Sequence, residues 1–231
     1  MQRRKFTSAV ISAGGLWGLA AWPAADAAEL SQGDAAAGIR AALERGAASA
    51  VSLLGRSGGF LDNPKVRIPL PGFLNEAAKL AKFTGQQQRV DDLITAMNRA
   101  AEAAVPQAKT LLVNAVKSMS VEDGKQILTG GDNSVTQFFS RKTRAPLSVK
   151  FLPIVTKATE KVSLADKYNA VASKVSSLGL VKKEDANIQQ YVTGKALDGL
   201  YLMIGEEERK IRQDPIGTGS AILQKVFGAL K

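Results

Sequence analysis

The chain has 231 residues, of which 45% are hydrophobic and 23% are charged, and its formal net charge is +10. This composition is typical of a globular protein and excludes a disordered one, and the length suits one sizeable core or at most two small ones. The sequence contains no cysteine and no histidine, which excludes disulfides, thiolate or imidazole metal sites and histidine-based catalysis, so an enzyme would have to use carboxylates, Lys, Tyr, Ser or Arg.

The first residues have the pattern of a cleavable export signal. Three basic residues (3–5) precede a short, weakly apolar stretch (9–22) and an Ala-x-Ala sequence (25–27), the order found in secretory signals. The paired arginines resemble the bacterial twin-arginine signal, and an ordinary secretory signal is the alternative. We therefore expect residues 1–27 to be removed and residues 28–231 to form one helical domain. That domain is expected to be periplasmic and soluble, without a lipid anchor because there is no cysteine.

A first helix and a non-helical segment follow. The periodicity of apolar residues predicts a helix over residues 34–54. Residues 63–71 contain three prolines, and Val66, Ile68 and Leu70 alternate with other residues. Proline blocks helix and biases the residue before it towards extended backbone. This segment is therefore predicted to be a short edge strand or an extended strap laid over the helices.

Helical periodicity dominates the remainder of the chain. Helix is predicted over residues 73–85 and 87–119, and Pro106 should kink or split the second of these. The predicted fold is all-α, a single-domain multi-helix bundle with one Pro-rich strap. Two further helices are predicted to begin after the Ser120–Asp123 capping box and after the cap Asp132, the second with a break at Pro146 and Pro153. Two more are predicted over residues 188–212, where Asn187 is the cap, and over residues 221–230.

The passage after Gly130 and Gly131 is the first candidate site. Backbone N–H groups at the start of a helix can bind an anion, and the polar residues that follow recur at helical spacing on one face. A carboxylate or phosphate ligand would suit them, although an acidic cap would repel it. The alternative is a capped helix with a solvated polar face. The residues assigned to this site are Asp132, Asn133, Gln137, Arg141 and Lys142.

The long helix over residues 188–212 provides the second candidate site. Lys195 and Asp198 are predicted to line a groove there. The alternative is an exposed helix, since its last turns contain two Glu-first i,i+4 pairs, Glu206 with Lys210 and Glu208 with Arg212. The glycines inside this helix, Gly199 and Gly205, are interpreted as positions of close helix contact.

Other polar residues and motifs give weaker signals. Asn98, Arg99 and Glu102 precede Pro106 and are interpreted as an ordinary polar helix face. The sequence has no phosphate-binding loop, dinucleotide-binding motif, nucleophile elbow or calcium-binding loop. We therefore expect no cofactor and no metal.

Three passages resemble a known family. They are Asn-Pro-Lys-Val-Arg-Ile-Pro-Leu-Pro (63–71), Gly-Gly-Asp-Asn-Ser-Val-Thr-Gln-Phe-Phe (130–139), and Tyr-Val-Thr-Gly-Lys-Ala-Leu-Asp-Gly-Leu-Tyr (191–201) with its continuation Glu-Glu-Glu-Arg-Lys-Ile-Arg (206–212). Together they look like the family of domain of unknown function 4197, from about residue 36 to the end. The resemblance implies a bacterial, mostly envelope-directed helical protein and no established activity. Many relatives look like lipoproteins, a feature that this cysteine-free sequence does not share.

Three functions remain open from the sequence. The first is a non-enzymatic binding protein for an apolar or anionic ligand held between helices. The second is a protein–protein adaptor of the envelope, and the third is an enzyme that uses carboxylate, Lys or Tyr chemistry. Basic residues are spread along the chain without an arginine-rich tail, so nucleic acid is not an expected partner. We expect no membrane span in the mature chain and leave the oligomeric state open.

Overall fold

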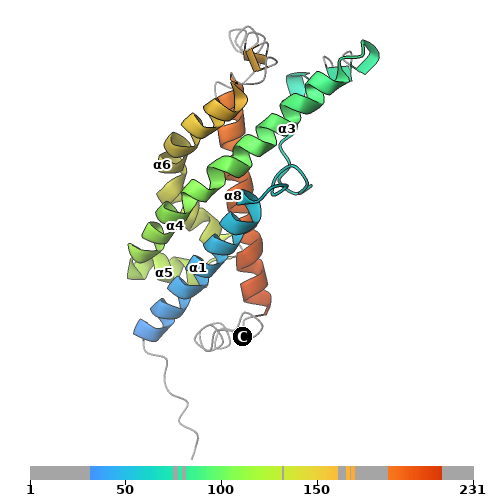
Figure 1. Cartoon of the computed structure of the whole chain (residues 1–231). Helices are drawn as coiled ribbons and strands as arrows, with labels where there is room; N and C mark the ends of the chain where they lie inside the picture. The colour runs from blue at the N-terminus through green and yellow to red at the C-terminus, as the bar shows by residue number, and fades with distance from the viewer. Residues whose placement is uncertain are drawn as a thin grey trace, which may run out of the picture.

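The structure is a computed structural model that describes residues 32–74, 78–79, 82–131, 133–160, 165–166, 168–169 and 187–214 (Figure 1). The predicted signal peptide and the predicted last helix lie outside these residues. The described part contains helices and no strand, which confirms the all-α fold. Its elements are α1 (Gln32–Gly55), the 3-10 helix η1 (Gly72–Leu74), α3 (Gln87–Ala104), the 3-10 helix η2 (Val105–Gln107), α4 (Ala108–Lys117), α5 (Val121–Thr129), α6 (Ser134–Thr159) and α8 (Ile188–Gln213).

Helix α8 is the central element of the bundle. It contacts α1, α3 and α6, and in Figure 1 it runs behind α3 along the length of the molecule. Apolar side chains are buried all along it, from Ile188 at its first residue to Ile211 near its end. Because a helix that is apolar on several sides must be covered on several sides, α8 is enclosed by its neighbours and leaves only part of its surface for a site.

Two predicted helix starts are confirmed by their side-chain hydrogen bonds. Ser120 and Asp123 form a complete capping box at the start of α5, with the Ser120 side chain accepting from the Asp123 N–H. Asn187 caps α8 by accepting from the N–H of Gln190 at 2.7 Å. In contrast, α6 begins after Asn133, whose side chain makes no capping hydrogen bond.

Prolines act differently in two parts of the bundle. Pro106 lies in η2 and separates α3 from α4, which confirms the predicted split. The predicted break at Pro146 and Pro153 is wrong, because α6 continues through both. Each proline removes one backbone N–H and so leaves a carbonyl four residues earlier without its helical partner. Those carbonyls belong to Lys142 and Val149, which are exposed, so water can hydrate them at small cost.

The strap segment (residues 63–71) is non-helical as predicted, with turns up to residue 66 and no regular secondary structure after it. Ile68 is 1% exposed, and its N–H and C=O both bond to the side chain of Asn98. Tyr191 donates from its hydroxyl to the carbonyl of Pro69 at 3.0 Å. The strap segment is therefore fixed to both α3 and α8.

The loop just before the strap segment is held by a buried carboxylate. One oxygen of Glu102 accepts from the N–H groups of Phe60 and Leu61, and the other accepts from Arg99. Burial opposes the charge, but these hydrogen bonds outweigh it and hold the pKa of Glu102 below its ordinary value. The interpretation of Asn98 and Glu102 as an ordinary polar helix face is wrong. Both side chains are buried, and both bind backbone groups of the non-helical segments between α1 and η1.

Two glycines of α8, Gly199 and Gly205, mark close contacts, as predicted. A Cβ at Gly199 would lie 2.8 Å from the ring of Phe60, and one at Gly205 would lie 2.8 Å from the hydroxyl of Thr136. Gly199 thus lets the loop before the strap segment lie directly against α8. Gly205 likewise lets α6 lie directly against α8 at Thr136.

Candidate functional site

An open groove of about 1190 Å³ lies between α6 and α8, next to η1. We call it the α6–α8 groove. Helix α6 lines it with residues of successive turns, from Ser140 to Leu152, and α8 lines it from Gln190 to Asp198. Its surface mixes apolar side chains with hydroxyl and charged groups. Its lining includes Phe73, Arg141, Arg144, Ser148, Leu152, Tyr191, Thr193, Gly194, Lys195, Leu197 and Asp198.

One ion pair joins the two helices across this groove. Arg144 of α6 donates to Asp198 of α8 at 2.7 Å, and the two side chains are 44% and 52% exposed. The guanidinium also lies 5.9 Å from the ring centroid of Tyr201, within cation–π range. Burial raises the pKa of Tyr201, whose hydroxyl is hydrogen-bonded to the hydroxyl of Thr143. Tyr201 therefore stays neutral and gives Arg144 a fixed surface to lie on.

Two other cations of the groove have no carboxylate partner among the described residues. Lys195 places its ammonium 5.8 Å from the ring centroid of Tyr191, and Arg141 makes a long hydrogen bond of 3.5 Å to the amide oxygen of Gln126. Within the described ranges, no ion pair joins either side chain to Asp or Glu. Since Arg141 belongs to α6 and Lys195 to α8, the groove carries uncompensated positive charge on both sides.

A buried hydroxyl lines the same groove. Thr193 is 3% exposed, and its Oγ1 has no hydrogen-bond partner in the described part of the chain. A buried polar atom without a partner costs about 1–3 kcal/mol. Most helical threonines avoid that cost by bonding to a carbonyl of the preceding turn, as Thr143 does with Phe139. Beside the groove, Thr193 therefore holds a buried hydroxyl that no described residue satisfies.

A family comparison covers nearly the whole chain. The model of a family described as protein of unknown function (DUF4197) matches residues 29–228. The chain belongs to the DUF4197 family. This confirms the resemblance carried by the three passages, and the family description assigns no activity. No significant match to the chain was found among curated proteins or among solved structures.

The groove of this DUF4197 protein contains three of the predicted site residues. Arg141, Lys195 and Asp198, which were assigned to two separate candidate sites, line it together. Arg144, Tyr191 and Thr193 line it as well and were missed. Arg144 had a usable signal, because it follows Arg141 by three residues and therefore lies on the same face of α6. The position of Thr193 depends on how α8 packs, which the sequence does not specify.

The remaining predicted residues of this DUF4197 protein lie elsewhere. Asn133 and Gln137 line a shallow depression next to the groove, shared with Arg141. Lys142 is directed to another partner, since its ammonium lies 3.6 Å from the carboxylate of Asp123. Asp132 lies outside the described residues. Asn133, Gln137 and Arg141 thus line one depression, and Lys142, which was expected nearby, pairs with Asp123 instead.

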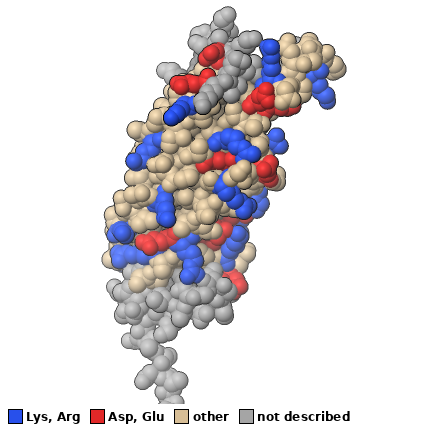
Figure 2. All heavy atoms as spheres, in the orientation of Figure 1, with Lys and Arg blue, Asp and Glu red and all other residues tan. Residues whose placement is uncertain are grey.

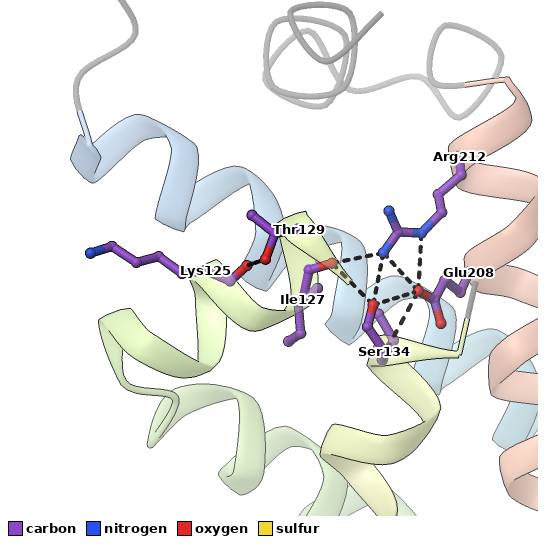
Figure 3. A network of polar contacts seen from close by, with 7 residues as sticks. Lys125, Ile127, Thr129, Ser134, Glu208 and Arg212 are labelled. Carbon is purple, nitrogen blue, oxygen red and sulfur yellow. Dashed lines mark hydrogen bonds and ion pairs between the residues drawn. The ribbon is translucent and has the colours of Figure 1, made fainter. Parts of the chain in front are cut away.

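The start of α6, which was a candidate site for an external anion, binds a carboxylate of the protein itself. Glu208 of α8 accepts from the N–H of Val135, at 3.4 Å, and from the hydroxyl of Ser134 (Figure 3). The N–H of Gly130 also has an acceptor, the carbonyl of Gln126 at 3.0 Å. Because these donors already have acceptors, the first turn of α6 offers little to a ligand.

Glu208 and Arg212 form a buried ion pair that joins three helices. Arg212 donates to Glu208 at 2.8 Å and also to the carbonyl of Ile127 in α5 and the hydroxyl of Ser134 in α6 (Figure 3). Glu208 is 5% exposed, so the prediction of an exposed helix end is wrong for this pair. The predicted Glu206–Lys210 pair is also replaced, since Glu206 pairs with Lys65 and Arg209, and Lys210 pairs with Glu207. Arg209 and Glu207 lie on α8 itself at i,i+3 spacing, whereas Lys65 comes from the strap segment, a contact that helix periodicity does not report.

The charged surface of this DUF4197 protein is mixed. On the face shown in Figure 2, basic side chains are spread out and acidic side chains lie among them. Among the described residues, no group of three or more His, Cys, Asp or Glu is arranged to hold a metal ion. In the same part of the chain, every helix is too short or too polar to span a bilayer.

Proposed function

We propose that this protein is an exported, non-enzymatic binding protein that takes an amphipathic anionic ligand in the α6–α8 groove. The observation that carries the proposal is the pair of cations, Arg141 and Lys195, which face one open groove from two helices without a carboxylate partner among the described residues. An oxyanion that reached both would make charge-assisted hydrogen bonds, which are about twice as strong as neutral ones.

The size and lining of the groove support a small organic ligand. Its volume of about 1190 Å³ is open to solvent and exceeds the size that most small-molecule sites require. Phe73, Leu152 and Leu197 offer apolar contact within the same groove. A ligand with one anionic end and one apolar end would therefore match the surface better than an inorganic ion would.

The interior of the bundle gives less support to a fully apolar ligand. The cavity between α1 and α8, beside Glu208, measures about 20 Å³. That volume holds a single water molecule, and the walls are closely packed side chains of the core. The proposed ligand therefore binds at the surface between two helices and not inside the core.

The other two functions have weaker support. An enzyme that uses two carboxylates needs them near each other, and Asp198 is the acidic residue that lines the groove within the described part of the chain. An adaptor needs a contiguous apolar surface. Among the described residues, Val149 and Leu152 are exposed large apolar residues that share α6, whereas Phe83 before α3, Val121 in α5 and Leu202 in α8 lie on separate elements.

Export is part of the proposal and rests on the sequence. The basic start, the weakly apolar stretch and the Ala-x-Ala sequence before residue 28 have the order of a secretory signal. A protein of this kind would meet its ligand in the periplasm. Mass spectrometry of the protein recovered from the periplasm of an expressing bacterium tests this part, and a chain that stays in the cytoplasm with its first 27 residues intact contradicts it.

The binding proposal is tested by titrating the uniformly ¹⁵N-labelled chain with phenyl phosphate at pH 8 and following backbone amide shifts. Benzyl alcohol, which is neutral, serves as the matched ligand control. We expect saturable shifts at the amides of Arg141, Thr193 and Gly194 with phenyl phosphate and not with benzyl alcohol. Shifts that map only to other parts of the chain, or none at all, contradict the proposal.

A pair of matched variants separates the groove from general charge. Arg141→Ala with Lys195→Ala removes two positive charges from the groove, and Lys117→Ala with Lys150→Ala removes two from exposed positions outside it. Since a hydrogen bond to a charged group contributes about 1.5–3 kcal/mol, we expect the first double variant to bind phenyl phosphate at least about tenfold more weakly. The second should stay within about threefold of wild type. Equal weakening in both would show that only the net charge matters.

A further inference from the structure

The Arg144–Asp198 ion pair differs from the other charges of the groove, because both partners lie on the surface that a ligand would contact. A carboxylate oxygen of Asp198 lies 2.7 Å from a guanidinium nitrogen of Arg144, and 52% of the Asp198 side chain is exposed. Arg144 keeps a second support, the ring of Tyr201 at 5.9 Å. The guanidinium would therefore remain in place at the groove wall if Asp198 turned away.

We propose that Asp198 is an internal competitor for the anionic group of the ligand, and that binding displaces its carboxylate from Arg144. This inference rests on the function proposed above. In the empty groove Asp198 satisfies Arg144. In the filled groove an oxyanion of the ligand takes that place, so that Arg141, Arg144 and Lys195 all face the bound anion.

The energetics of the pair favour such an exchange. Ion pairs between exposed side chains contribute little to stability, because water solvates both groups well when they separate. A carboxylate or phosphate group binds a guanidinium with the same two-pronged geometry that Asp198 can offer. The ligand thus replaces one oxyanion by another at Arg144, while Asp198, which is half exposed, is solvated outside the groove.

The charges also indicate which ligands suit the groove. Three cations and one carboxylate leave two positive charges on the groove surface. A phosphate monoester carries nearly two negative charges at pH values above its second pKa of about 6. A ligand with this headgroup would neutralise the groove with Asp198 still nearby, which is why phenyl phosphate at pH 8 is the probe of choice.

The experiment measures the dissociation constant of phenyl phosphate for wild type and Asp198→Asn by the same amide-shift titration. We expect Asp198→Asn to bind about two- to fivefold more tightly, the ratio that corresponds to the small free energy of an exposed ion pair. Asp92→Asn removes one negative charge from an exposed position on α3 and should bind as wild type does. A second comparison places Asp198→Asn in an Arg144→Ala background, where we expect most of the tightening to disappear.

The possible outcomes separate this inference from the proposed function. If Asp198→Asn binds equally or more weakly, Asp198 positions Arg144 and does not compete, and the inference is overturned while groove binding stands. If the tightening is as large without Arg144, the effect is a general one of charge, and the inference is again overturned. If neither wild type nor Asp198→Asn shows shifts at the groove, the proposed function itself has failed, and the inference with it.

Discussion

Asn98 binds Ile68 in the way that a neighbouring β-strand would. Its side-chain oxygen accepts from the Ile68 N–H at 2.8 Å, and its side-chain nitrogen donates to the Ile68 carbonyl at 2.9 Å. The same nitrogen also donates to the carbonyl of Ile94. A single side chain of α3 thus satisfies both buried backbone groups of Ile68, and the strap segment has no strand beside it within the described part of the chain.

The first prediction concerns this pair. Asn98→Ala leaves both polar groups of Ile68 buried without partners, and each unsatisfied group costs about 1–3 kcal/mol. We expect the free energy of unfolding to fall by about 2–4 kcal/mol in urea denaturation. Asn114→Ala, at an exposed position on α4, is the matched control and should change stability by less than about 0.5 kcal/mol. Similar losses of unfolding free energy in both variants would show that the hydrogen bonds between Asn98 and Ile68 do not account for the effect.

The second prediction is a pH dependence caused by Glu102. Its pKa in the folded chain lies below the ordinary value of 4.5, so the unfolded chain binds more protons in the acidic range. The stability that this difference contributes is present at neutral pH and is lost as the pH falls through 4.5 towards the lower folded pKa. Glu102→Gln removes the difference.

Urea denaturation of wild type and Glu102→Gln over a range of pH tests this. At pH 7 we expect the variant to be less stable by about 1–3 kcal/mol, because hydrogen bonds from Arg99 and two backbone N–H groups lose a charged acceptor. The gap should narrow between about pH 5 and pH 2. A gap that stays constant over this range would mean that Glu102 is not ionised in the folded chain at neutral pH.

The third prediction compares the effects on stability of alanine at two glycines of α8, Gly194 and Gly199. A Cβ at Gly199 would lie 2.8 Å from Phe60 and 3.3 Å from Val66, whereas a Cβ at Gly194 would meet nothing within 4 Å. Replacing a helical Gly by Ala stabilises by about 1 kcal/mol when there is room. Overpacking a core typically costs about 1–3 kcal/mol.

We therefore expect opposite signs for the two alanine variants. Gly194→Ala should raise the midpoint of thermal unfolding, and Gly199→Ala should lower it. Both positions lie inside the same helix, so helix propensity alone predicts the same gain for each. Gains of equal size at both positions would show that the loop at Phe60 does not lie against α8 as closely as the structure has it.

The fourth prediction concerns the buried pair Glu208–Arg212. Arg212→Ala leaves the Glu208 carboxylate buried without its counter-ion, and breaking such a pair typically costs about 3–5 kcal/mol. Arg209→Ala removes an arginine from the same helix end whose side chain is 45% exposed and pairs with Glu206. That control should cost less than about 1 kcal/mol.

A double replacement makes this prediction more specific. In Glu208→Leu with Arg212→Met, neither side chain carries a charge that needs a partner, so we expect a large part of the stability lost in Arg212→Ala to return. The free energies of unfolding of the three variants provide the comparison. A double variant that is less stable than Arg212→Ala would indicate that the bonds to Ser134 and Ile127 matter more than the buried charge does.

The helices and their caps could be predicted because they depend on neighbouring residues. Periodic apolar positions gave α1 and α8 within two residues of their observed bounds, and Ser120 with Asp123 identified the start of α5. The break predicted at Pro146 and Pro153 was wrong, because a proline ends a helix only if the lost hydrogen bond cannot be replaced. Whether the freed carbonyls face water depends on the bundle and not on the local sequence.

The candidate site was predictable in part for the same reason. Arg141, Lys195 and Asp198 are polar residues at helical spacing, and the sequence shows that much. That α6 and α8 lie side by side and bring the three together is a tertiary property. Glu208 shows the limit most clearly, because its i,i+4 partner Arg212 was identified correctly, but its burial and its role as the anion of the α6 helix start were not.

The two prolines of α6 make the walls of the groove mechanically unequal. Between them α6 contributes Ser148 and Leu152 to the groove, in a stretch whose flanking turns each have one backbone hydrogen bond fewer than an ordinary helix has. Segments with fewer such bonds open at lower free energy. The α8 wall keeps its full hydrogen-bond ladder through Tyr191 and Asp198 and is enclosed by its neighbours. Of the two walls, the one formed by α6 should therefore open at the lower free energy, and it is the wall that would adjust to the ligand proposed above.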